Sequence, residues 1–305
     1  MPNYSRIYIY RFIAKLLHPT AVLNASFFPA PQIFWDRLVQ IGSAQLILPA
    51  IYGALKRKKL VHHVPKDLVS YLQEIKDLNL KRNAAILKQI NFLSKVFNVN
   101  QIDHVFLKGA AMIITRPYDT LSERMVGDID ILVSENDISR DQQLLIDKGF
   151  EALQKEFSFI DASNEFSFTK GVLSENSNKH LNRIIHPNYI AAVEIHRCLL
   201  VIENHLIPSE DVLKNKLQSK LGHWIPSKQN LWKHAILNWQ FNDSGMIQVD
   251  LAFRSVLDIL YLEPKDVLLK LEGSLTKKNI QFVEELENST DLQQSPPEYV
   301  HRRNN

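Results

Sequence analysis

The sequence predicts an α/β fold of the α+β kind, in which a small mixed sheet is flanked by an N-terminal and a C-terminal helical portion. Apolar residues recur at helical spacing in the first hundred residues and again in the last third of the chain. Between these regions, short apolar runs are separated by polar turns, which is typical of strands. We therefore expect helices at both ends and strands in the middle.

The 305 residues are enough for one large or two modest domains. We expect four segments, namely a helical portion over 1–100, a sheet-containing core over 101–205, a helical portion over 206–288 and a tail over 289–305. The tail is polar and contains Pro296-Pro297, so we expect it to be disordered.

The N-terminal portion contains two clear helical patterns. Pro31 opens the first, and its apolar positions are Phe34, Leu38, Ile41 and Leu46. The second runs from Pro65 to Phe97, with a stripe at Ile86, Ile90, Leu93 and Phe97. The basic run 56–59 between them is either an RNA-binding patch or a solvated helix end. We favour the helix end, because cations are stabilising at helix C-termini.

The core begins with a strand that turns sharply into a helix. Val105–Leu107 is a short apolar run, and Lys108-Gly109 and Ala110 follow it. The free N–H groups of a helix N-terminus can bind phosphate oxygens. Lys108 is then either a solvated strand end or a positive charge placed on that phosphate.

A second apolar run, Ile129–Val133, carries two carboxylates at its start. Asp128 and Asp130 are two residues apart, so both project from the same face of the strand. Two carboxylates on one face repel each other unless a cation neutralises them, and Mg²⁺ prefers such oxygen ligands. An exposed turn is the alternative, but the apolar flanks favour a buried strand.

The remainder of the core predicts one helix and several strands. The helix covers 137–148 and stops at Gly149. The strands are expected at Phe150–Leu153, Phe157–Ile160, Phe166–Thr169, His180–Ile185 and Ile190–His196. The last of them places Glu194 and His196 on one face. His196 could there orient an acid or contact a substrate.

The C-terminal portion returns to helical spacing. Its two apolar faces comprise Trp232, Ile236 and Trp239, then Phe253, Val256, Leu257 and Leu260. Arg254 and Asp258 are four residues apart, and we expect them to form an ion pair. His234 is expected to be either buried or a surface residue of a helix.

Composition and motifs exclude several classes of protein. The net charge of +3 permits contact with nucleic acid but does not argue for it. Cys198 is the single cysteine, so no intrachain disulfide forms, which fits a cytoplasmic location. The longest apolar stretch, 44–55, is shorter than the roughly 20 residues of a membrane span. No zinc-ligand spacing, P-loop or Gly-x-Ser-x-Gly motif occurs.

The core resembles the nucleotidyltransferase superfamily related to DNA polymerase beta, and in particular a bacterial branch of uncharacterised nucleotidyltransferases. The residues that carry this resemblance are Leu107-Lys108-Gly109, then Arg124 shortly before Asp128-Ile129-Asp130-Ile131-Leu132-Val133, then His186-Pro187 and Val193-Glu194-Ile195-His196. The resemblance implies a sheet in which Glu194 stands beside the strand of Asp128 and supplies a third carboxylate.

The resemblance also implies an activity, namely transfer of a nucleoside monophosphate from an NTP to an acceptor with release of pyrophosphate. Asp128, Asp130 and Glu194 would hold two Mg²⁺ ions. The NTP would be contacted by residues of the corner and its surroundings, Lys108, Gly109, Ala110, Arg124 and His196. For Arg124 an ion pair with Asp128 is the equal alternative.

One position departs from the family pattern. Ala110 stands where the family usually has a small polar residue, so a hydroxyl contact to phosphate is lost and only backbone N–H groups are available. This departure leaves open a non-catalytic module that senses nucleotide or partners a toxin. Kinase-like phosphoryl transfer also stays open. The acceptor could be a small molecule, a protein or RNA.

Overall fold

The computed structural model describes residues 6–19, 21–23, 28, 31–118, 120–152, 164–169, 191–200, 204–242 and 253–262. The α+β class expected from the sequence is confirmed. The expected strands Phe157–Ile160 and His180–Ile185, the His186-Pro187 pair and the tail 289–305 lie outside the described residues. Within the described ranges, no helix is long and apolar enough to cross a membrane.

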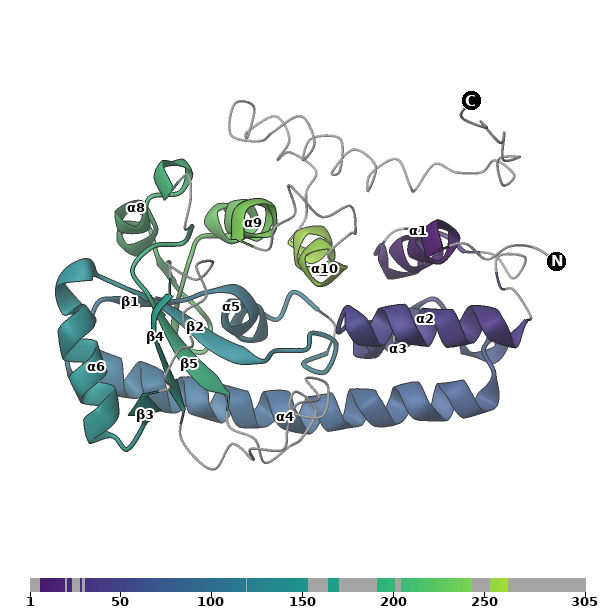
Figure 1. The fold of residues 1–305 in the computed structure, drawn as a ribbon, viewed down its shortest axis with the longest axis horizontal. Coiled ribbons are helices and arrows are strands. Elements are labelled where there is room, and N and C mark those ends of the chain that lie inside the picture. The colour runs from purple at the N-terminus through teal and green to yellow at the C-terminus, as the bar shows by residue number, and fades with distance from the viewer. Residues whose placement is uncertain are drawn as a thin grey trace, which may run out of the picture.

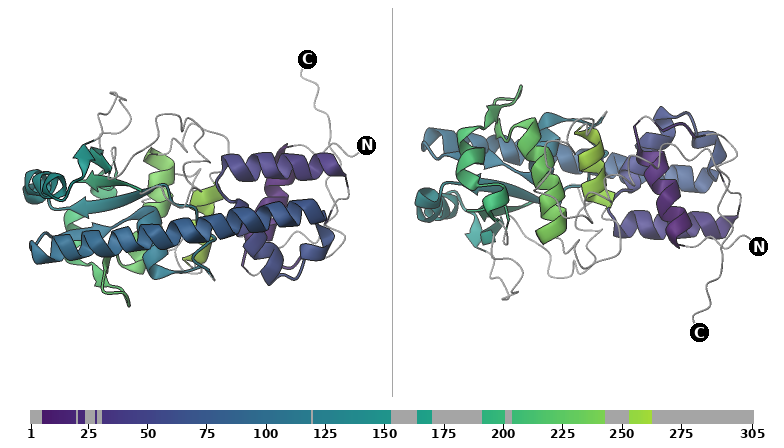
Figure 2. Two further views of the ribbon diagram at one scale, coloured as in Figure 1. Left: turned by 90° about the horizontal axis from the view of Figure 1, so that it is seen from below. Right: turned by 90° about the horizontal axis from the view of Figure 1, so that it is seen from above.

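The N-terminal portion is helical, as expected. Its helices are α1 (Arg6–Leu17), α2 (Gln32–Ala44), α3 (Leu48–Arg57) and α4 (Lys66–Val99), with a short 3₁₀ turn at Val61–His63. α4 is one continuous helix of 34 residues. It runs along the whole length of the molecule, from the α1–α3 bundle to the far side of the sheet (Figures 1 and 2).

The basic run 56–59 covers the end of α3, as expected, but it is not simply solvated. The Lys58 ammonium donates hydrogen bonds to the carbonyls of His18, at 2.8 Å, and Ala21. Arg57 donates to the carboxylate of Glu123 at 2.6 Å. These two cations therefore tie α3 to the end of α1 and to a loop of the core.

The central sheet has the strand order β1-β2-β5-β4-β3. Its strands are β1 (His104–Phe106), β2 (Asp128–Val133), β3 (Glu151–Ala152), β4 (Asn164–Thr169) and β5 (Ala192–His196). β2 and β5 are parallel, and the other neighbours pair antiparallel. The connections contain α5 (Lys108–Thr115) after β1 and α6 (Ile138–Asp147) after β2. β5 therefore lies beside β2, as the resemblance implied.

Side chains alternate between the two faces of the sheet. Ile129, Ile131 and Val133 pack in the core cluster that contains Ile86, Ile90 and Phe97 of α4. Val105, Leu107 and Leu132 pack in a second cluster with Leu213 of α8 and Leu237 of α9. Because successive residues of a strand point to opposite faces, the even-numbered Asp128 and Asp130 face the α9 side.

The C-terminal portion contains α8 (Ser209–Lys214), α9 (Lys228–Leu237) and α10 (Phe253–Tyr261), with 3₁₀ residues Asn204–Leu206 before them and a π-helical turn Asn238–Asn242 after α9. The expectation of helix throughout is wrong at one place, where β6 (Leu217–Gln218) and β7 (Trp224–Ile225) form a small hairpin. α8, α9 and α10 lie on the side of the sheet opposite α4 (Figure 2).

Candidate active site

The corner between β1 and α5 is formed by a tight approach of two chain segments. The Leu107 amide donates to the Asp130 carbonyl at 2.9 Å, which fixes the end of β1 against β2. Lys108 has a φ of 44°, in the left-handed region. A Cβ on Gly109 would lie only 3.0 Å from Val126 Cγ1, so glycine fits best there. The first-turn amides of α5 have no intrahelical acceptor and are available to an anion.

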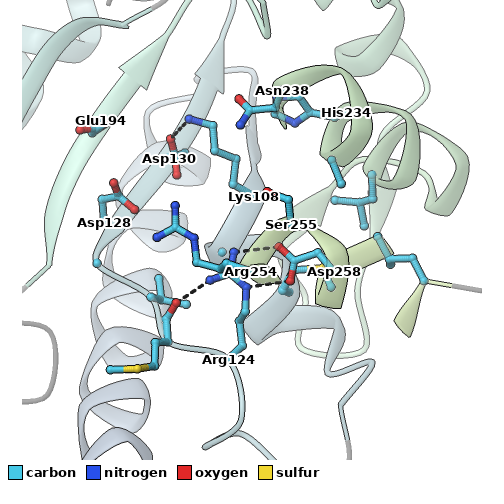
Figure 3. A pocket seen from close by; sticks show the side chains of 18 residues that line it. Lys108, Arg124, Asp128, Asp130, Glu194, His234, Asn238, Arg254, Ser255 and Asp258 are labelled. Atoms are coloured by element: carbon cyan, nitrogen blue, oxygen red, sulfur yellow. Dashed lines mark hydrogen bonds and ion pairs between the residues drawn. The ribbon is translucent and has the colours of Figure 1, made fainter. Parts of the chain in front are cut away.

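Three carboxylates meet at one pocket next to this corner. The parallel register places Asp130 opposite Glu194, and Asp128 precedes Asp130 on the same face. All three line a pocket of about 260 Å³, together with Lys108, Gly109 and Arg124 (Figure 3). Six of the eight residues that we expected at the site therefore surround one pocket. Ala110 and His196 do not line it.

Asp130 is almost fully buried, and two side chains share one of its oxygens. Lys108 Nζ donates to Asp130 Oδ1 at 2.7 Å, and His196 Nε2 lies 2.8 Å from the same oxygen. Burial alone would raise the pKa of Asp130, but Lys108 and His196 hold it well below its usual range. Burial also lowers the pKa of His196, so the neutral imidazole donates this bond. His196 thus lies behind Asp130 and orients it.

Asp128 is the less well compensated carboxylate. Burial and the negative charge of Asp130 raise its pKa, while Lys108 and Arg254 act in the opposite direction. Burial lowers the pKa of Lys108, but the negative charges of Asp130 and Asp128 have the larger opposite effect. The pKa of the ammonium is therefore raised. Arg254 projects from α10 and lines the pocket near Asp128, a position that the sequence did not predict.

The donor set fits a divalent cation. Ligand-type atoms of Asp130, Glu194 and His196 lie within 4.8 Å of one another, although His196 uses its Nε2–H to bind Asp130. Asp128 adds a carboxylate on the same face of the sheet. Carboxylate oxygens suit Mg²⁺ or Mn²⁺. The raised pKa of Asp128 also indicates a cation site. Asp128 and Asp130 are both buried, and the positive charge around them does not fully compensate their negative charges.

Arg124 has a different partner from the one considered from the sequence. Its Nε and Nη2 donate to the two oxygens of Asp258 at 2.7 and 2.8 Å, and its Nη1 donates to the Met125 carbonyl at 2.5 Å. The alternative of an ion pair with Asp128 is therefore wrong. The expected pair of Arg254 with Asp258 is wrong as well, because Arg124 takes both carboxylate oxygens of Asp258.

The loop before β2 is fixed by two asparagines of α4. Asn79 Nδ2 donates to the Ser122 carbonyl at 2.6 Å, and Asn83 Nδ2 donates to the carbonyls of Leu121 and Arg124 at 2.6 and 2.7 Å. Both asparagines are fully buried. They hold the loop that presents Arg124 to the pocket, and sequence reasoning gave them no such role.

The wall of the pocket that faces the carboxylates comes from α9 and the turn after it. Its residues are Leu231, His234, Ala235 and Asn238, which share one helix face at spacings of three and four. Figure 3 shows Lys108 between Asp130 and this wall. The helical spacing was visible in the sequence, but only the fold shows that this face meets the acids.

Comparison with known proteins identifies a family. The family model described as "Uncharacterised nucleotidyltransferase" matches residues 31–237, which is more than half of the chain. The matched region begins before α2 and ends with α9, so it contains the three carboxylates and the part of the facing wall that α9 supplies, namely Leu231, His234 and Ala235. No curated protein matches the chain.

Proposed function

The chain belongs to the uncharacterised nucleotidyltransferase family, and from this premise we propose that it transfers a nucleoside monophosphate from an NTP to an acceptor. The observation that carries the proposal is the meeting of Asp128, Asp130 and Glu194 at one pocket beside a helix N-terminus. A helix N-terminus binds phosphate, and paired carboxylates hold the cations that phosphoryl chemistry requires.

In this proposal the carboxylates of the pocket bind metal, and its amides and cations bind the triphosphate. Asp128, Asp130 and Glu194 would hold Mg²⁺, which when bound supplies charge neutralisation at the transferred phosphorus and at the leaving group. The first-turn amides of α5 and the Arg254 guanidinium would bind oxygens of the triphosphate. Lys108, which lines the pocket and donates to Asp130, would exchange Asp130 for a phosphate oxygen when the nucleotide binds.

The proposed reaction is an in-line displacement at the α-phosphorus. An oxygen or nitrogen of the acceptor forms a bond to the α-phosphorus, and the bond to the bridging oxygen breaks. Pyrophosphate leaves with that electron pair. The acceptor loses its proton to Glu194, whose side chain is 22% exposed, or to solvent. His196 keeps Asp130 in position throughout, through its bond at 2.8 Å.

The test is incubation with each α-labelled NTP, Mg²⁺ and a cell extract, followed by separation of labelled protein, RNA and small molecules. Wild-type protein should release pyrophosphate and label one class of acceptor. Asp128→Asn should lose at least about 100-fold in rate, the scale seen when one electrostatic contact to a transition state is removed. Asp67→Asn, exposed in the first turn of α4, is the matched control.

The products separate the competing functions. Equal labelling by the wild-type protein and the Asp128→Asn variant would overturn the proposal. Release of nucleoside diphosphate in place of pyrophosphate would indicate a kinase. Mg²⁺-dependent nucleotide binding without any product would indicate a regulatory module with the same fold.

A further inference from the structure

The α9 wall of the pocket contains a buried polar atom without a protein partner. His234 is 2% exposed, and its Nε2 makes no hydrogen bond. Across the described ranges, other buried side chains also have unpartnered atoms, but His234 is the one among them that lines the pocket. An unpaired buried polar atom destabilises the protein, so a ligand that pairs with it gains affinity.

The chemical state of His234 follows from its surroundings. Burial lowers the pKa of His234 to about 3, and the nearby Lys108 charge acts in the same direction. The imidazole is therefore neutral at physiological pH. A hydrogen bond with the backbone of Leu199 raises the pKa of His234, which is the effect expected when the ring donates to a carbonyl. Because Nε2 has no partner, this bond uses Nδ1, and the neutral ring presents a lone pair at Nε2.

A neutral acceptor is unsuited to bind phosphate, which itself offers only acceptor oxygens at neutral pH. The residues around His234 support a different ligand. Leu231 and Ala235 of α9 add apolar side chains next to His234, and Asn238 adds an amide. An apolar surface with a few polar groups is typical of sites for flat ligands such as nucleobases. Arg254 extends toward Asp128, and Lys108 donates to Asp130, so both cations pair with the acids (Figure 3).

We propose that the α9 wall is the subsite for the nucleoside part of the bound nucleotide, with His234 Nε2 accepting a hydrogen bond from it. This inference rests on the proposed function and adds the recognition of the nucleoside to it. The group that donates is either the exocyclic amine of adenine or cytosine, or a ribose hydroxyl. Both carry the N–H or O–H that a lone pair requires, and the experiment separates them.

The experiment measures binding by calorimetry, which needs no acceptor substrate. The probe is the α,β-methylene analogue of ATP with Mg²⁺, and the variants are His234→Phe and His234→Gln. Phe keeps a ring but has no acceptor, whereas Gln can place an acceptor near the position of Nε2. We expect the Phe variant to bind about 5- to 30-fold more weakly, as for the loss of one hydrogen bond, and the Gln variant to bind within about threefold of wild type. His62→Phe, at an exposed position, is the matched control.

Nucleotides that lack one donor identify the group. If the amine donates, the inosine analogue should bind wild type and the Phe variant equally. If a ribose hydroxyl donates, the 2′-deoxy or the 3′-deoxy analogue should bind wild type and the Phe variant equally. Circular dichroism shows whether the Phe variant is folded. If it is not, the analogues are measured on wild-type protein alone. The analogue that lacks the donating group should then bind more weakly than the ATP analogue, by a factor similar to that expected for the Phe variant.

The outcomes distinguish this inference from the function on which it rests. Equal affinity of wild type and the Phe variant for the ATP analogue would overturn the subsite and leave the nucleotidyltransferase proposal intact. An equal loss for inorganic tripolyphosphate would overturn it too, because His234 would then act on phosphate. Failure of the wild-type protein to bind any nucleotide would overturn both.

Discussion

Arg124 binds both carboxylate oxygens of Asp258, at 2.7 and 2.8 Å, although 134 positions separate the two residues. Both side chains are buried, with 9% of each exposed. The Tyr118 hydroxyl donates to the same carboxylate. Burial opposes the charge on Arg124, but Asp258 outweighs it and raises the pKa of the guanidinium. The pair joins the loop before β2 to α10, and so it sets where Arg254 enters the pocket.

Asp258→Asn should destabilise the protein strongly, because it leaves the buried Arg124 charge without its counter-ion. Breaking a buried ion pair costs about 3–5 kcal/mol. Urea unfolding should show this as a lower midpoint with an unchanged slope. The double variant Arg124→Met/Asp258→Leu is the control, and it should recover much of the loss because neither charge is then buried. An unchanged midpoint in Asp258→Asn would show that the pair contributes nothing.

Asn83→Ala should loosen the loop that carries Arg124. The change removes two hydrogen bonds, leaves the Leu121 carbonyl without its Asn83 donor and leaves the Arg124 carbonyl with the longer bond from Asn79 at 3.2 Å. We expect a loss of about 1–3 kcal/mol in the free energy of unfolding and a lower rate of nucleotidyl transfer. Asn98→Ala, at an exposed position on the same helix, should change neither. Full activity in the Asn83→Ala variant would show that the loop does not need this clamp.

Asp128→Asn should stabilise the protein when no divalent cation is present. The pKa of Asp128 is raised in the folded state, so above its ordinary pKa the ionised carboxylate opposes folding. Removing the charge should raise Tm by about 2 °C for each kcal/mol relieved. Mg²⁺ should then raise the Tm of wild type but not of the variant. Equal Mg²⁺ shifts in both proteins would place the cation elsewhere.

Asp141 should contribute a loss of stability as the pH rises from about 4 to 8. Burial and the nearby charge of Asp137 raise the pKa of Asp141 to about 8. Between the ordinary pKa near 4 and this value, the folded state holds a proton that the unfolded state releases. Titration of Asp141 therefore lowers the free energy of unfolding by up to about 1.4 kcal/mol per pH unit in this range.

Asp141→Asn should flatten that part of the profile, which urea unfolding at a series of pH values would measure. Asp147→Asn, at an exposed position on the same helix, is the control and should leave the slope as in wild type. A wild-type slope in the Asp141→Asn variant would contradict the raised pKa of Asp141.

Local patterns predicted the parts of the fold that local physics decides. Short apolar runs located β2 and β5, and the 3.6-residue period located α4. The small residues after Lys108 indicated the strand–helix corner. The β6–β7 hairpin escaped detection because its strands have two residues each, too short for any period to register.

The parts of the site that the sequence did not predict depend on distant contacts. Arg124 has Asp128 four positions away, yet Asp258 binds it, because α10 folds over the loop and offers both carboxylate oxygens. The α9 wall was visible as a helix face, but nothing within α9 indicates that this face meets β2. His234 could be recognised as part of the pocket only once the positions of α9 and α10 against the sheet were known.

The length of α4 decides how the protein can be shortened. The same helix packs against α3 at one end, holds the Asn79 and Asn83 clamp in its middle and covers the sheet with Ile86, Ile90 and Phe97. A chain trimmed to start at residue 101 would keep all three carboxylates and lose one entire wall of their core. A fragment that keeps the folded core must therefore retain α4, so the N-terminal hundred residues cannot be removed as a whole.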